Sequence, residues 1–100
     1  NTILAGNVAA TAPDAWGTFA STGHNLIGDA TDSSGWQPSD LIGVAPLLDP
    51  LADNGGPTLT HALLPGSPAL NAGSSIEAFD QRGKDRNFNG VDMGAYEYQP

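Results

Sequence analysis

The sequence predicts an all-β fold made of short strands and tight turns, and two observations lead to this prediction. First, the 100 residues include 13 glycines and 8 prolines, packed most densely into residues 49–73 (DPLADNGGPTLTHALLPGSPALNAG). Proline fixes φ and glycine permits positive φ, so the chain is expected to turn often between brief apolar pieces. Second, no window carries an apolar stripe with helical spacing over a useful length.

The first half of the chain contains two similar apolar segments, residues 1–6 (NTILAG) and residues 25–28 (NLIG). Their aliphatic and β-branched residues favour strands, and a glycine ends each segment. They begin about 24 residues apart, and periods of about 20–30 residues with one short strand each are typical of stacked solenoid coils. We therefore expect the two segments to be successive rungs that lie parallel to each other.

Local patterns predict the remaining elements. Residues 29–40 have no apolar periodicity and are expected to form a loop in which Trp36 folds back over an apolar edge. The elements expected after this loop are brief apolar pieces at 41–44 and 46–48, a strand at 58–64, one turn of helix at 67–72 and the clearest strand at 92–98. Side chains alternate along a strand, so Tyr96 and Tyr98 would share one face of the last one.

Charge and composition exclude several classes of protein. The net charge is −8 and no Lys or Arg precedes Arg82, so binding to the phosphate backbone of nucleic acid is not expected. The chain has no cysteine to form a disulfide, and no apolar run approaches the ~20 residues of a membrane span. An acidic surface without bases over the first eighty residues suits a protein that is soluble outside the cell, or one that attracts divalent cations.

Three motifs together resemble a known family. They are residues 50–73 (PLADNGGPTLTHALLPGSPALNAG), residues 80–83 (DQRG) and residues 92–98 (DMGAYEY). They resemble the C-terminal segment of bacterial right-handed parallel β-helix surface proteins, of the polymorphic outer-membrane-protein and choice-of-anchor Q types. The resemblance covers nearly the whole chain and is strongest from residue 51 to residue 98.

This resemblance implies a right-handed parallel β-helix, or solenoid, in one domain spanning residues 1–100. Residues 1–48 would form terminal coils and loops, and residues 49–100 a loop-rich C-terminal cap with its closing strand. It also implies an extracellular or cell-surface location in a bacterium, in the last part of a longer protein. The implied function is structural, as an adhesin-like scaffold or a self-stacking fibre subunit. Its partners would be preceding coils of a longer chain or head-to-tail copies that build a filament.

A carbohydrate-binding or carbohydrate-active β-helix module is the alternative function, with glycans as the ligands. This alternative requires Trp16 and Trp36 to be exposed in one groove, whereas aromatic residues in a small domain more often belong to the core or the cap. Asp49 and Asp53 could suggest a glycosidase pair, but they flank Pro50 and suit turn capping better. No enzymatic activity and no catalytic residues are therefore expected.

Residues 85–92 (DRNFNGVD) resemble the first part of a calcium-binding loop. In a Ca²⁺ site Asp85, Asn87 and Asn89 would offer side-chain oxygens, Val91 its carbonyl and Asp92 a second carboxylate. The position where such a loop carries its bidentate Glu does not hold a Glu in this sequence. The alternative is a turn in which the Asn and Asp side chains bond the backbone.

Several other residues are expected to have structural roles. Asp80 and Arg82 would form a clamp, because an Arg guanidinium can bridge a carboxylate and nearby carbonyls at a corner without ladder bonds. The alternative for Arg82 is a catalytic or ligand-binding role. The remaining residues expected to be structural are Gly55, Gly56 and Pro57 at a corner and Tyr96 and Tyr98 in the closing strand. The two histidines, His24 and His61, are expected to lie in a turn and a strand rather than in a metal or catalytic site.

Overall fold

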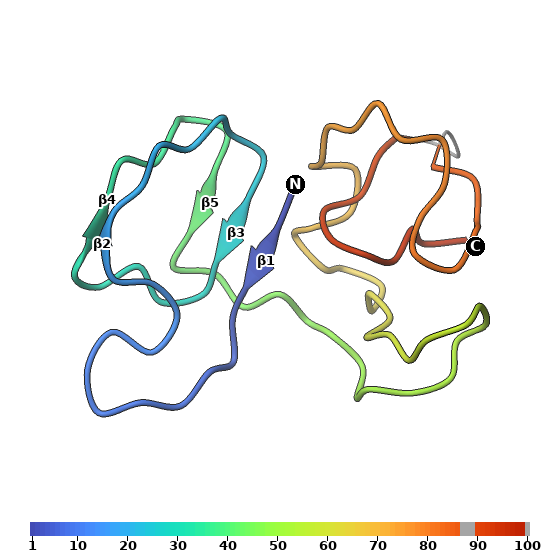
Figure 1. The fold of residues 1–100 in the computed structure, drawn as a ribbon, viewed down its shortest axis with the longest axis horizontal. Helices are drawn as coiled ribbons and strands as arrows, with labels where there is room; N and C mark the ends of the chain where they lie inside the picture. Colours follow the sequence, from blue (N-terminus) through green and yellow to red (C-terminus); the bar gives the residue numbers. More distant parts are fainter. Residues whose placement is uncertain (87–89, 100) are drawn as a thin grey trace.

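The computed structural model describes residues 1–86 and 90–99 and contains five short parallel strands, all in the first 42 residues. Each strand is two residues long, so most of the described chain is loop and turn. The strands are β1 (Ile3–Leu4), β2 (Gly17–Thr18), β3 (Leu26–Ile27), β4 (Ser33–Ser34) and β5 (Leu41–Ile42). In Figure 1 they occupy one half of the molecule, and residues from about 45 onward form the other.

The five strands form two small sheets between which the chain alternates. The first sheet has the order β1-β3-β5 and the second pairs β2 with β4. Ile3 lies opposite Leu26, and the expected parallel pairing of these two segments is confirmed. β3 and β5 pair with Leu26 opposite Leu41. Each of these two strands is a Leu-Ile pair followed by glycine, a short repeat that the 24-residue spacing of the first two segments does not include.

The prediction of a right-handed parallel β-helix is wrong, because the strands do not close into a solenoid. After β5 the chain returns to neither sheet. Its later pairings are isolated antiparallel bridges, namely Leu48 with Leu63, Ala52 with Thr60 and Phe79 with Asp85. The physical reason is local, because the prolines and glycines that follow β5 bend the chain at intervals too short for another parallel rung.

The predicted closing strand at residues 92–98 and the predicted strand at 58–64 are also wrong. Residues 93–95 are bends, and 92–98 folds back on itself because the backbone N–H of Asp92 donates to the carboxylate of Glu97. The carboxylate of Asp92 in turn accepts the N–H of Tyr98 at 2.6 Å. Segment 58–64 contributes only bridge residues, and 67–72 is a series of turns instead of a helical turn.

An apolar core joins the two halves of the molecule. Its fully or nearly fully buried members are Leu26 from β3 and Leu63, Ala69 and Met93 from the second half. β1 lies between the other strands and the second half in Figure 1, and the N–H of Gly94 donates to the carbonyl of Asn1 at 3.2 Å. The strand β1 is therefore a contact element between the two halves as well as the edge of its sheet.

Among the described residues, no helix is long and apolar enough to cross a membrane.

Candidate functional site

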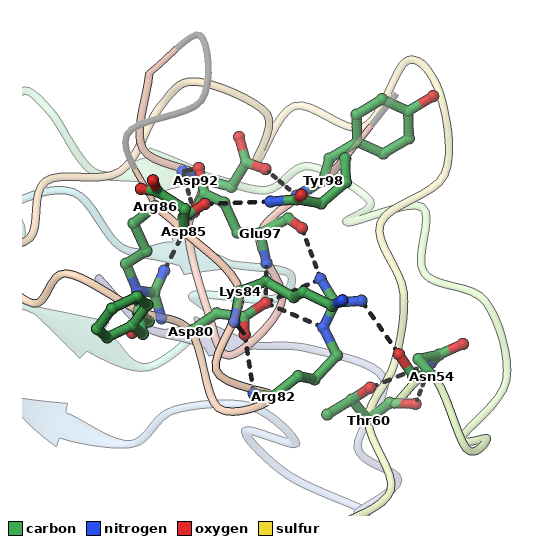
Figure 2. A network of polar contacts seen from close by, with 12 residues as sticks. Asn54, Thr60, Asp80, Arg82, Lys84, Asp85, Arg86, Asp92, Glu97 and Tyr98 are labelled. Atoms are coloured by element: carbon green, nitrogen blue, oxygen red, sulfur yellow. Dashed lines mark hydrogen bonds and ion pairs between the residues drawn. The ribbon is translucent and has the colours of Figure 1, made fainter. Parts of the chain in front are cut away.

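Arg82 bridges three separate parts of the C-terminal half. Its Nε donates to the Asp80 carboxylate at 3.0 Å, its Nη1 to the carbonyl of Asn54 at 3.1 Å and its Nη2 to the carbonyl of Glu97 at 2.8 Å. The guanidinium also stacks over the ring of Tyr96, 3.8 Å from its centroid. Figure 2 shows these bonds converging from different loops. A planar guanidinium suits this role because its donors point in fixed, divergent directions.

A second buried pair lies beside the first in Figure 2. The side chain of Glu97 is fully buried, and both of its oxygens accept the N–H of Asp92 at 3.1 Å. Arg86 donates from Nη1 to Glu97 at 3.3 Å, and its other nitrogens donate to the carbonyls of Phe79 and Gly94. Arg86 is itself almost completely buried. The charge of Glu97 is therefore paired and hydrogen-bonded, as burial of a charge requires.

The two buried carboxyl groups titrate in opposite directions. Desolvation raises the pKa of Glu97 above its usual value, and the nearby charge of Asp92 raises it further against the opposing effect of Arg86. Burial also tends to raise the pKa of Asp80, but the N–H groups of Glu97 and Lys84 and the contacts of Arg82 outweigh it. The pKa of Asp80 is therefore lowered. The cluster therefore holds the loops of the C-terminal half together through buried, paired charges.

The residues proposed for calcium binding are only partly brought together. Asn87 and Asn89 lie outside the described residues. The carboxylate of Asp92 is buried and accepts the N–H groups of Asn71 at 2.7 Å and Tyr98 at 2.6 Å. Asp85 takes part in an antiparallel bridge through its backbone. Within residues 1–86 and 90–99, no group of three or more His, Asp or Glu side chains is arranged to hold a metal ion.

The tryptophans and histidines noted in the sequence do not converge. Trp36 stacks on Phe19 with ring centroids 4.6 Å apart, whereas Trp16 is 76% exposed. The small cavity that Trp36 lines does not include Trp16. Nδ1 of His24 lies 3.2 Å from the carbonyl of Ala72, so this ring joins the two halves of the molecule.

A groove of about 1090 Å³ lies between β1 and the second half of the chain. Its lining comes from residues 1–7, 46–51, 59–63 and 93–96, together with Gln81. Three leucines of this lining, Leu47, Leu51 and Leu59, are exposed, the latter two by 55%. Asp49 is the only carboxylate in the lining, and no Lys or Arg of the described chain lines the groove. We call this feature the β1 groove.

The outer backbone edge of β1 is only partly paired: the carbonyl of Asn1 accepts the N–H of Gly94, whereas the next outward-facing groups, those of Ile3 and of Ala5 just after the strand, are open to the β1 groove. On its inner side, the carbonyls of Thr2 and Leu4 accept the N–H groups of Leu26 and Gly28 of the neighbouring strand. Successive residues of a strand point their backbone groups to opposite sides, so those of Ile3 and Ala5 face away from β3. No described residue forms a hydrogen bond with the N–H or C=O of either one.

The β1 groove and the Arg86–Glu97 pair were not predicted from the sequence. A signal for the pair was present, because Asp80, Arg82, Arg86, Asp92 and Glu97 are spaced closely in a chain with few charges. The sequence does not reveal the groove, because its walls come from segments that are distant along the chain.

No protein-family model, curated protein or solved structure matches this chain. The family resemblance of its motifs therefore stays an expectation, and a functional proposal rests on the geometry described above.

Proposed function

We propose that this chain is a structural, adhesin-like module of an extracellular bacterial protein, and that it holds a polypeptide in the β1 groove. The observation that carries the proposal is the row of partly exposed leucines, Leu47, Leu51 and Leu59, along one groove. Apolar side chains gathered in a concave surface are typical of interaction sites, since burying each against a partner is favourable.

The walls of the β1 groove are fixed by the contacts of Arg82. One wall includes Tyr96, on which the guanidinium stacks, and the other includes Thr60. Arg82 donates to the carbonyl of Asn54, whose side chain donates to Thr60 at 3.0 Å and 3.1 Å. A groove held in shape before binding loses less entropy when it is filled. The contacts of Arg82 thus favour binding by holding the groove in shape, although Arg82 does not line the groove itself.

The extracellular location is supported by composition. Charged residues make up only 14% of the chain, and the first eighty residues carry acids but no bases. Such a surface favours solubility and repels other acidic molecules. No observation specifically favours the glycan-binding alternative, because Trp16 and Trp36 line no common cavity among the described residues.

The proposal is tested by selecting from a displayed library of random peptides on the immobilised chain, and then measuring the affinity of the enriched peptides by calorimetry. The Leu51→Ser/Leu59→Ser variant should bind them at least about tenfold more weakly, because two apolar contacts are lost. The matched control is Ile76→Ser, since Ile76 is fully exposed and lies outside the groove lining. If no peptide is enriched, or if binding is equal for the groove variant and the control, the proposed function is wrong.

A further inference from the structure

We propose that the occupant of the β1 groove is an extended apolar polypeptide segment carrying Lys or Arg, which adds as a new strand to the outer edge of β1. This inference rests on the proposed function and specifies how the groove binds and what it selects.

The first step of the argument is the open backbone edge. Ile3 and Ala5 direct their N–H and C=O groups away from β3, and within the described chain these groups have no partner. An unpaired strand edge is a template for another strand, because main-chain bonds form whatever the sequence of the partner. An extended segment in the β1 groove would complete these bonds.

The second step concerns the side chains of the added segment. Alternate side chains of a strand point to opposite faces, so every second residue of the occupant can lie against the exposed leucines. Leu51 and Leu59 are each 55% exposed, which leaves apolar area for such residues to cover. The segment should therefore alternate apolar residues with polar ones.

The third step limits the occupant to a single segment. The second half of the chain stands directly opposite β1, since Gly94 donates to the carbonyl of Asn1. A Cβ added to Gly94 would also lie 3.0 Å from Cδ1 of Ile3. Because Gly94 already pairs with Asn1 at the start of the edge, an added segment can pair only with Ile3 and Ala5. A peptide segment needs only the groove itself.

The fourth step is charge. Asp49 is the only carboxylate of the described groove lining, and the first 81 residues contain no Lys or Arg to oppose a basic partner. The Asp49 side chain is exposed, so it adds only a modest attraction to the approach of a cation. Acidic segments are disfavoured by the net charge of −8.

The experiment uses a short peptide in which Val alternates with Thr, with Lys at both ends. Its affinity is compared with that of two N-methylated forms, one methylated at the Val residues and the other at the Thr residues. In an added strand only one of these two sets donates its N–H groups to β1. The expected result is that one methylated form binds at least about tenfold more weakly than the other.

Equal affinities of the two methylated peptides would overturn strand addition while leaving a groove that binds peptides. If the unmodified peptide does not bind while the displayed library still yields binders, the proposed occupant is wrong and the proposed function still stands.

A peptide with Glu in place of Lys should bind more weakly, and equal binding would refute the choice of a basic segment. A dimer of the chain that competes with the peptide would show that the occupant is a second copy, and would overturn the proposal.

Two proline variants of the protein test the same edge from the other side. Ala5→Pro removes an N–H that faces the groove, and it follows a strand residue, whose conformation is compatible with proline. Ile42→Pro is the matched control, because Ile42 lies in β5 at the opposite edge of the same sheet and directs its N–H away from β3. Weaker peptide binding is expected for Ala5→Pro only. Equal binding by both folded variants would contradict strand addition at β1.

Discussion

At the scale of single residues, the C-terminal half depends on charges that are buried and paired. Glu97 is fully buried and accepts bonds from Arg86 and from the backbone of Asp92. A buried ion pair contributes little net stability compared with apolar residues of the same shape, yet losing one partner leaves an uncompensated charge. The consequence is that each partner is individually sensitive to substitution.

Arg86→Met should lower the free energy of unfolding by about 3–5 kcal/mol, because Glu97 then stays buried without its cation. Urea unfolding followed by circular dichroism measures this loss. The double variant Arg86→Met/Glu97→Gln is the control and should lose less than the single variant, since the unpaired charge is gone. A single-variant loss under about 1 kcal/mol would place this pair among ordinary surface ion pairs.

The opposite pKa shifts predict two limbs in the dependence of stability on pH. The pKa of Asp40 and that of Asp80 lie below 3.8, because hydrogen bonds outweigh burial. Their contribution to stability is therefore present above pH 3.8 and lost as the pH falls through the folded values. The pKa of Glu97 is raised above 4.5 by burial, so the folded state binds more protons and stability falls as the pH rises from 4.5 through the folded value.

Glu97→Gln should remove the decrease of stability above pH 4.5 and keep the acid limb below pH 3.8. Asp40→Asn should do the reverse, weakening the acid limb because the carboxylate that accepts bonds from Ser21, Asn25 and Gln37 is lost. Urea unfolding over a series of pH values measures both curves. Parallel curves for the wild type and both variants would show that these groups do not control the pH dependence.

At the scale of elements, the strands are short because glycines follow or interrupt them. Gly35, directly after β4, has φ +92°, and a Cβ at this position would meet the backbone oxygen of Phe19. Phe19 directly follows β2 and donates its N–H to the carbonyl of Ser34 at 2.8 Å. The close pairing of β2 with β4 therefore requires a residue without a side chain.

Gly35→Ala should destabilise the protein by clearly more than the roughly 1–2 kcal/mol that a left-handed conformation costs an ordinary residue. The matched control is Gly43→Ala, because Gly43 has φ +71° but open space around the position of a Cβ. Comparing the two by thermal unfolding separates the backbone clash from the conformational strain. Similar losses in both variants would mean that the β2–β4 contact relaxes freely.

At the scale of the whole molecule, the two halves form one compact body. The radius of gyration is 13.5 Å, near the ~13 Å typical of a compact chain of this length. The core contains Leu26 of β3 together with Leu63 and Met93 of the second half. Both halves contribute fully or nearly fully buried side chains to this shared core, so unfolding should be cooperative.

Two sets of natural probes test this cooperativity. Trp16 and Trp36 report on the first half, whereas Tyr96 and Tyr98 report on the second. Tryptophan fluorescence and tyrosine circular dichroism should give the same urea midpoint, and Met93→Ala should lower both equally by removing a fully buried side chain, at a cost of about 2–5 kcal/mol. Separate midpoints would show that the halves unfold independently.

Several features of the fold follow from neighbours along the chain and were predictable. Glycine permits positive φ and proline fixes φ, so both favour turns from the local sequence alone. The parallel pairing of segments 1–6 and 25–28 was expected from their similarity, and the structure shows it, with Ile3 opposite Leu26. The uneven distribution of charge, with every base at or after Arg82, is also a property of the sequence alone.

Tertiary structure decided the path after β5 and the position of the β1 groove. The sequence predicted further strands at 58–64 and 92–98. Instead, the carboxylate of Glu97 accepts the N–H of Asp92, and the carboxylate of Asp92 accepts the N–H of Tyr98. Arg82 also donates to the carbonyl of Asn54. These bonds join side chains to backbone groups that are distant along the chain, so no local pattern encodes them. Their energies depend on burial, which exists only once the core has formed.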